Sequence, residues 1–127
     1  MHVSKVTADR QIRKVLDQVI RLHSRLVEPT YHTAMALTDV ARVHRDHIVP
    51  VRALVDRMIM NPSDCAGVLD AVELAEVTNA EHRRLGGLWS DHAETCALLL
   101  SAPVGDLVDI GLQRYATAGI ELHRRAT

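Results

Sequence analysis

The sequence predicts an all-α protein that folds as an antiparallel, up-down bundle of four helices. Three observations lead to this prediction. Apolar residues recur at alternating spacings of three and four, prolines and polar caps separate four such segments, and no run of alternating β-branched residues is bounded by turns. The chain has 127 residues, of which 47% are apolar, so we expect a single helical-bundle domain over residues 1–127.

The first two predicted helices cover residues 7–28 and 31–60. Thr7 and Thr30 stand before them, where a side-chain oxygen can accept a backbone N–H of the first turn. In the second helix the apolar stripe keeps its phase across Pro50, which predicts a helix kinked near this proline. In the first helix the stripe consists of Ile12, Leu16, Val19, His23 and Leu26.

The last two predicted helices cover residues 64–100 and 104–124, with Ser63 and Ser101 as caps. Because two adjacent glycines cost about 2 kcal/mol of helix propensity, the sequence leaves open whether the third helix breaks at Gly86-Gly87. Pro103 suits the first turn of the fourth helix, where its missing N–H costs nothing. The connections are short, so neighbouring helices are expected to run antiparallel.

The predicted helices differ in length, and the middle two are longer than the outer two. Part of their apolar stripes therefore extends beyond the bundle, which predicts a homodimer. We find no complete catalytic set in the sequence. The main hypothesis is a non-enzymatic module that acts through protein–protein contacts, either with a second copy or with another protein.

The eight histidines suggest an alternative, a metal-binding bundle. At about 1.5 Å of rise per residue, counting from the breaks places His44, His82 and His123 in one layer, with Asp17 close by. Three imidazoles and a carboxylate suit a transition metal such as zinc or iron. The histidines can also simply fill space in a core without Phe, and the absence of Glu-x-x-His and His-Glu-x-x-His motifs favours that interpretation.

Acidic residues form a second group of candidates. Facing acidic pairs on helices can hold Mg²⁺ against a pyrophosphate. The segments Glu73-Leu74-Ala75-Glu76 and Gly105-Asp106-Leu107-Val108 resemble those of MazG-type nucleotide pyrophosphohydrolases, although Pro103 stands where the second motif of that family has Glu. This resemblance implies an all-α, Mg²⁺-dependent enzyme. The acidic residues concerned are Asp70, Glu73, Glu76, Asp106 and Asp109.

A third interpretation rests on the segment from His82 to Gly87. The sequence His82-Arg83-Arg84-Leu85-Gly86-Gly87 resembles that of histidine phosphotransfer bundles, in which basic residues and a glycine follow the histidine. The resemblance implies an exposed histidine that accepts a phosphoryl group. The apolar stripe instead predicts that His82 points inward.

Charge and hydropathy narrow the partners and the location. Fifteen basic and sixteen acidic residues give a net charge of −1, so nucleic-acid binding is not indicated. The longest purely apolar run, Ala97 to Leu100, is far too short to span a membrane. The polar N-terminal segment has no apolar stretch typical of a secretory signal, so we expect a cytoplasmic protein.

Overall fold

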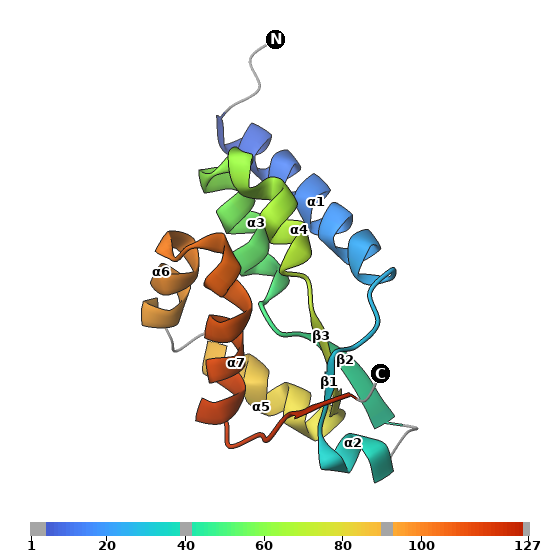
Figure 1. Ribbon diagram of the computed structural model, residues 1–127. Helices are drawn as coiled ribbons and strands as arrows, with labels where there is room; N and C mark the ends of the chain where they lie inside the picture. Colours follow the sequence, from blue (N-terminus) through green and yellow to red (C-terminus); the bar gives the residue numbers. More distant parts are fainter. Residues whose placement is uncertain (1–4, 39–41, 90–92, 126–127) are drawn as a thin grey trace.

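The computed structural model describes residues 5–38, 42–89 and 93–125, and it places helices around a small mixed sheet (Figure 1). The predicted all-α four-helix bundle is therefore wrong. The elements in chain order are α1 (Lys5–Ser24), β1 (Tyr31–His32), α2 (Ala34–Thr38), β2 (Val43–His47), α3 (Val51–Met60), the 3₁₀ turn η2 (Pro62–Asp64), α4 (Cys65–Asp70), β3 (Leu74–Thr78), α5 (Asn79–Trp89), α6 (Ala93–Ser101), the 3₁₀ turn η3 (Val104–Asp106), α7 (Leu107–Thr117) and β4 (His123–Arg124).

The sheet has the strand order β2-β3-β1-β4. β2 and β3 are antiparallel over five residue pairs, from Val43 opposite Thr78 to His47 opposite Leu74. β1 lies parallel to β3, and β4 lies antiparallel to β1. β3 is central, and its residues Leu74, Ala75 and Val77 are buried, as expected for a strand covered on both faces.

Pro50 marks the start of a helix and not a kink within one. It has extended backbone angles, φ −55° and ψ 141°, and α3 begins at the next residue. The chain before it forms β1, the short helix α2 and β2 instead of the first half of the predicted second helix. The spacing of four residues between His44 and Ile48 misled the prediction, because an even spacing also fits the two-residue repeat of a strand.

The predicted third helix is divided into α4, β3, α5 and α6. α5 passes through both glycines and ends at Trp89, so a break at Gly86-Gly87 does not occur. Its start is fixed by a capping box. The backbone N–H of Glu81 donates to Thr78 Oγ1 at 3.2 Å, and the N–H of Thr78 donates to Glu81 Oε1 at 2.9 Å.

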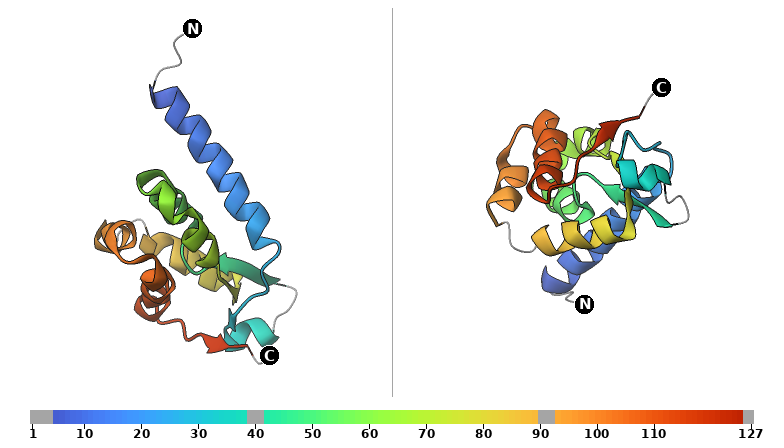
Figure 2. Two further views of the ribbon diagram at one scale, coloured as in Figure 1. Left: turned by 45° about the horizontal axis from the view of Figure 1, so that its top comes forward. Right: turned by 90° about the horizontal axis from the view of Figure 1, so that it is seen from below.

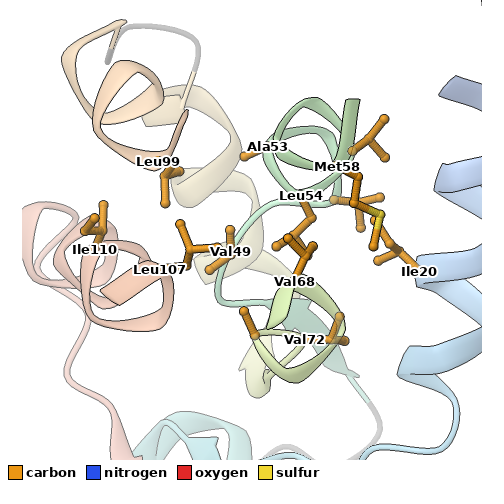
Figure 3. Close-up of a cluster of buried hydrophobic side chains, with 13 residues drawn as sticks. Ile20, Val49, Ala53, Leu54, Met58, Val68, Val72, Leu99, Leu107 and Ile110 are labelled. Atoms are coloured by element: carbon orange, nitrogen blue, oxygen red, sulfur yellow. The ribbon is translucent and has the colours of Figure 1, made fainter. Parts of the chain in front are cut away.

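Apolar side chains from α1, α3, α4, α6 and α7 point toward one another and form the larger core (Figure 3). A second buried cluster lies between the sheet, α5 and α7 and includes Ile48, Val77 and Leu85. Arg57 of α3 is also buried. Its guanidinium donates to Asp64 at 3.0 and 3.1 Å and to the carbonyl oxygens of Leu99 and Ala102. It therefore caps the C-terminal end of α6, where a cation is favoured.

Two helical glycines provide a matched test of the packing between α7 and the end of β2. A Cβ atom at Gly111 would lie 2.6 Å from the carbonyl oxygen of Ile48, whereas no described atom lies within 4 Å of a Cβ at Gly86. We expect Gly111→Ala to lower the free energy of unfolding by about 1–3 kcal/mol through overpacking. Gly86→Ala should raise it by up to about 1 kcal/mol through helix propensity.

Urea unfolding followed by circular dichroism measures both changes. An unchanged unfolding midpoint for Gly111→Ala would contradict the close approach of α7 to β2.

Candidate active site

A polar cleft of about 440 Å³ lies where β2 meets α1, α3, α5 and α7. Its walls contain four arginines, three histidines and one carboxylate. A cleft with so many titratable groups is a candidate active site. A slightly larger hollow of about 480 Å³ beside α7 is mostly apolar, with Glu121 as its charged lining residue. The polar cleft is lined by Arg21, His44, Arg45, Asp46, His47, Pro50, Val51, Arg52, His82, Gly86 and Arg114.

Asp46 is the buried anchor of the cleft. Its Oδ2 atom accepts a hydrogen bond from Arg114 Nη2 at 2.8 Å and another from the Tyr115 hydroxyl. The side chains of Asp46 and Arg114 are only 9% and 6% exposed, so each charge depends on the other. Arg114 also donates to the carbonyl oxygen of His47 at 2.8 Å, which joins α7 to the end of β2. The hydrogen bonds from Arg114 and Tyr115 hold the carboxylate of Asp46 in one orientation.

The second carboxylate oxygen of Asp46 faces His82. Asp46 Oδ1 lies 3.3 Å from His82 Nδ1, and the His82 side chain is 42% exposed. The ring of His82 also lies against that of His44, with 3.9 Å between the ring centroids. His44 and Asp46 are two residues apart on β2 and so project to the same face of the strand. The capping box at Thr78 then sets the first turn of α5, which carries His82.

His47 faces the other side of β2, toward α1. Its Nε2 atom is buried and has no hydrogen-bond partner among the described residues. Burial lowers the pKa of His47, while the charge of Asp46 partly opposes this shift. Burial and the neighbouring His82 lower the pKa of His44, again against the effect of Asp46. Both imidazoles are therefore neutral at pH 7, and each offers a nitrogen that can accept a proton.

Tyr115 acts as a hydrogen-bond donor in this cluster. Burial and the neighbouring Asp46 raise the pKa of Tyr115 above its usual range. The phenol therefore keeps its proton and directs it at Asp46 Oδ2. This leaves Oδ1 as the carboxylate oxygen directed toward the cleft.

The structure brings together two of the four predicted metal ligands. His44 and His82 are in contact, but they meet through β2 and α5 and not through a layer of four helices. Asp17 lies on α1, near His47 and paired with Arg21 at 2.6 Å. His123 lies in β4, at the opposite edge of the sheet from β2, where its ring is 6.0 Å from that of His32.

A zinc or iron site of the predicted kind is not seen. Within residues 5–38, 42–89 and 93–125, no group of three or more His, Cys, Asp or Glu side chains is placed to hold a metal ion. The predicted layer of histidines requires four helices side by side. In the structure, the sheet takes the place of part of the second and third predicted helices. The alternative hypothesis of an all-α, metal-binding bundle is therefore wrong over the described residues.

The acidic residues do not form the helical pairs that the MazG-type resemblance implies. Glu76 lies within β3 and Glu73 lies just before it, so the two do not share a helical face. Glu76 instead pairs with Arg125 at 3.1 Å, which fastens the C-terminal strand to the sheet. Asp70 ends α4, while Asp106 and Asp109 lie in η3 and α7.

Sequence reasoning missed Asp46, His47, Arg114 and Tyr115. The alternation of His44, Asp46 and Ile48 before Pro50 is typical of a strand that ends at a proline, and not only of the helix that was predicted there. The sequence from Thr78 to Glu81 has the pattern of a capping box and could have marked the start of α5. No local signal indicates Arg114, which is 68 residues from Asp46.

Comparison with protein-family models, with curated proteins and with solved structures finds no match for this chain. Among the helices of the described ranges, none combines the length and the apolar character needed to cross a membrane. The geometry of the cleft is therefore the basis for inferring a function.

The buried ion pair can be tested against an exposed one. Asp46→Ala leaves the guanidinium of Arg114 buried without its carboxylate, and we expect the free energy of unfolding to fall by about 3 kcal/mol or more. Asp17→Ala removes the pair with Arg21, whose side chain is 60% exposed, and should cost less than about 1 kcal/mol. Urea unfolding at pH 7 compares the two variants. Equal losses would show that burial does not strengthen the dependence of Arg114 on Asp46.

The lowered pKa of His47 predicts a pH-dependent stability. Because the pKa is lower in the folded chain than the ordinary value of 6.5, the unfolded chain takes up the proton first as the pH falls. The contribution is complete above about pH 7 and is lost as the pH falls through the folded value, at less than about 1.4 kcal/mol per pH unit. Unfolding between pH 8 and pH 5 should therefore give a steeper loss for the native chain than for His47→Gln. Parallel pH profiles would argue against a neutral, buried His47.

Proposed function

We propose that the cleft hydrolyses a phosphate ester by acid–base catalysis, with His82 as the general base. The observation that carries this proposal is the pairing of His82 with Asp46. A buried, doubly hydrogen-bonded carboxylate lies 3.3 Å from one nitrogen of a partly exposed imidazole. His82 Nδ1 makes no hydrogen bond with the described residues, so Asp46 acts through its charge, which stabilises the imidazolium that forms when the ring accepts a proton.

The arginines favour a phosphate as the substrate group. Arg21, Arg45 and Arg52 come from three different elements, α1, β2 and α3, and all line the same cleft. Guanidinium groups bind phosphate oxygens through paired hydrogen bonds and remain charged at any relevant pH. Asp46 is the carboxylate among the described lining residues, and Arg114 balances its charge. The charges of Arg21, Arg45 and Arg52 remain unbalanced by the described lining, and a phosphate ester with one or two negative charges complements them.

The neutral ring of His44 lies against the base. The centroids of the His44 and His82 rings are 3.9 Å apart, and a protonated His44 would repel the imidazolium that forms on His82. His82, supported by Asp46, accepts a proton from a water molecule as its oxygen attacks phosphorus. The leaving oxygen takes a proton from solvent as the phosphorus–oxygen bond breaks, and His82 then returns its proton to solvent. Water is the nucleophile because the described lining offers imidazole and guanidinium groups in place of a hydroxyl or thiol.

Hydrolysis of bis(p-nitrophenyl) phosphate and of labelled DNA and RNA oligonucleotides tests this function. We expect His82→Asn to lower kcat/KM by about 100-fold or more, the usual effect of removing a general base. His123→Asn is the matched control, because its side chain is 47% exposed and lies at the other edge of the sheet. It should hydrolyse the same substrate at the native rate.

The assays are run in EDTA and with added Mg²⁺ or Mn²⁺, so that any cation requirement is measured directly. A native chain without hydrolytic activity in all buffers would overturn the proposal. Equal activity of His82→Asn and the native chain would overturn the role of His82.

A further inference from the structure

Five apolar side chains on one side of α1 are exposed to solvent. Four lie within the helix, and Leu26 follows shortly after its end at Ser24. They succeed one another at steps of three, four, three and four residues, so they form a continuous stripe along the helix. The exposed fractions are 50% for Ile12, 57% for Val15, 41% for Val19, 57% for Leu22 and 84% for Leu26. We call this set the α1 stripe.

The core uses a different side of α1. Ile20 is completely buried in the larger core, and Leu16 and Val27 pack against it in part. Figure 2 shows α1 lying along one side of the molecule, with its N-terminal half extending past the other helices. The apolar surface of α1 is thus wider than the surface that the rest of the chain covers. Of the apolar residues predicted to form the core side of this helix, Leu16 packs against the core, whereas Ile12, Val19 and Leu26 are exposed. The free stripe lies on α1 and not on the two middle helices of the predicted bundle.

The spacing of the α1 stripe matches the seam of a coiled coil. Alternating steps of three and four place apolar residues along one side of a helix, and two such helices can pack along each other as a coiled coil. Ile12, Val19 and Leu26 occupy one of the two seam positions, and Val15 and Leu22 occupy the other. β-branched residues at the first position with leucine at the second favour pairs of helices. Ile12, Val19 and Leu22 follow this rule, and Val15 and Leu26 depart from it.

The composition beside the α1 stripe permits self-association. Gln11, Gln18 and Arg25 border it on the solvent side at intervals of seven residues, so two of these three flanking positions carry no charge. The five side chains together expose on the order of 500 Å² per copy, so a pair covers about 1,000 Å² before flanking contacts are added. A patch of this size is near the upper limit for the surface of a monomer and near the lower limit for a specific interface.

We propose that two copies of this chain associate through their α1 stripes as a symmetric helix pair. The same surface on both copies is self-complementary under a two-fold axis, which closes the assembly at two. Two copies share the seam pattern by construction, so no other helix has to be invoked. The proposal is independent of the chemistry in the cleft.

Sedimentation equilibrium across about a hundredfold range of concentration tests the association. We expect a dimer for the native chain and at least about a 100-fold weaker dimer for the double variant Val19→Glu/Leu22→Glu. Leu98→Glu is the matched control, since Leu98 is 51% exposed but lies on α6, and its dimer should dissociate as the native one does. Both substituted positions on α1 are exposed, and circular dichroism verifies that the variants are folded.

If the double variant does not fold, Val19→Ala/Leu22→Ala replaces it and should weaken the dimer in the same direction. A native chain that is monomeric at every concentration would overturn the proposal, including a monomer that instead binds lipid vesicles or another protein. A dimer of native strength in folded α1 variants would also overturn it, because the contact would then lie elsewhere.

Discussion

The ion pair between Asp46 and Arg114 is the constraint on which the arrangement of the cleft depends. Both side chains are more than nine-tenths buried, so each charge depends on the other. This requirement holds α7 against the end of β2, where Gly111 allows the backbones to approach closely. It also turns Asp46 so that one oxygen is occupied by Arg114 and Tyr115 while the other faces His82. The carboxylate of Asp46 thus both balances the buried charge of Arg114 and faces His82 in the cleft.

The sequence allowed the helical content to be recognised but not the sheet. α1 largely coincides with the predicted helix 7–28, and α7 lies within the predicted helix 104–124, because their apolar residues repeat with a helical period over several turns. β1 and β4 contain two residues each, and β1 pairs with residues of β3 that are 44 positions away and with residues of β4 that are 93 and 91 positions away along the chain. No local pattern of two residues can specify such pairing. β2 was missed for a different reason, since four-residue spacing of its apolar and histidine positions fits a strand as well as a helix.

Part of the candidate site was also accessible from the sequence. His44 and His82 were expected to share a layer, and they are in contact, although the geometry that joins them is a strand pair followed by a helix. The expectation for His123 depended on the false bundle, and the residue lies across the sheet. The sequence did not single out Arg57 or Arg114, because burial of a guanidinium is decided by distant carbonyl and carboxylate groups. Such contacts between distant residues produce no periodic pattern in the sequence.

The capping box at the start of α5 has a consequence for the neighbouring His82. The carboxylate of Glu81 accepts hydrogen bonds from the N–H of Thr78 and, at 2.8 Å, from the hydroxyl of Thr33. The first turn of α5 is therefore fastened both to the strand before it and to the residue that leads into α2. An imidazole mounted on so restrained a turn needs little rearrangement when a reacting group arrives. The hydrogen bonds that position the turn carrying His82 form during folding and do not have to form when a ligand binds.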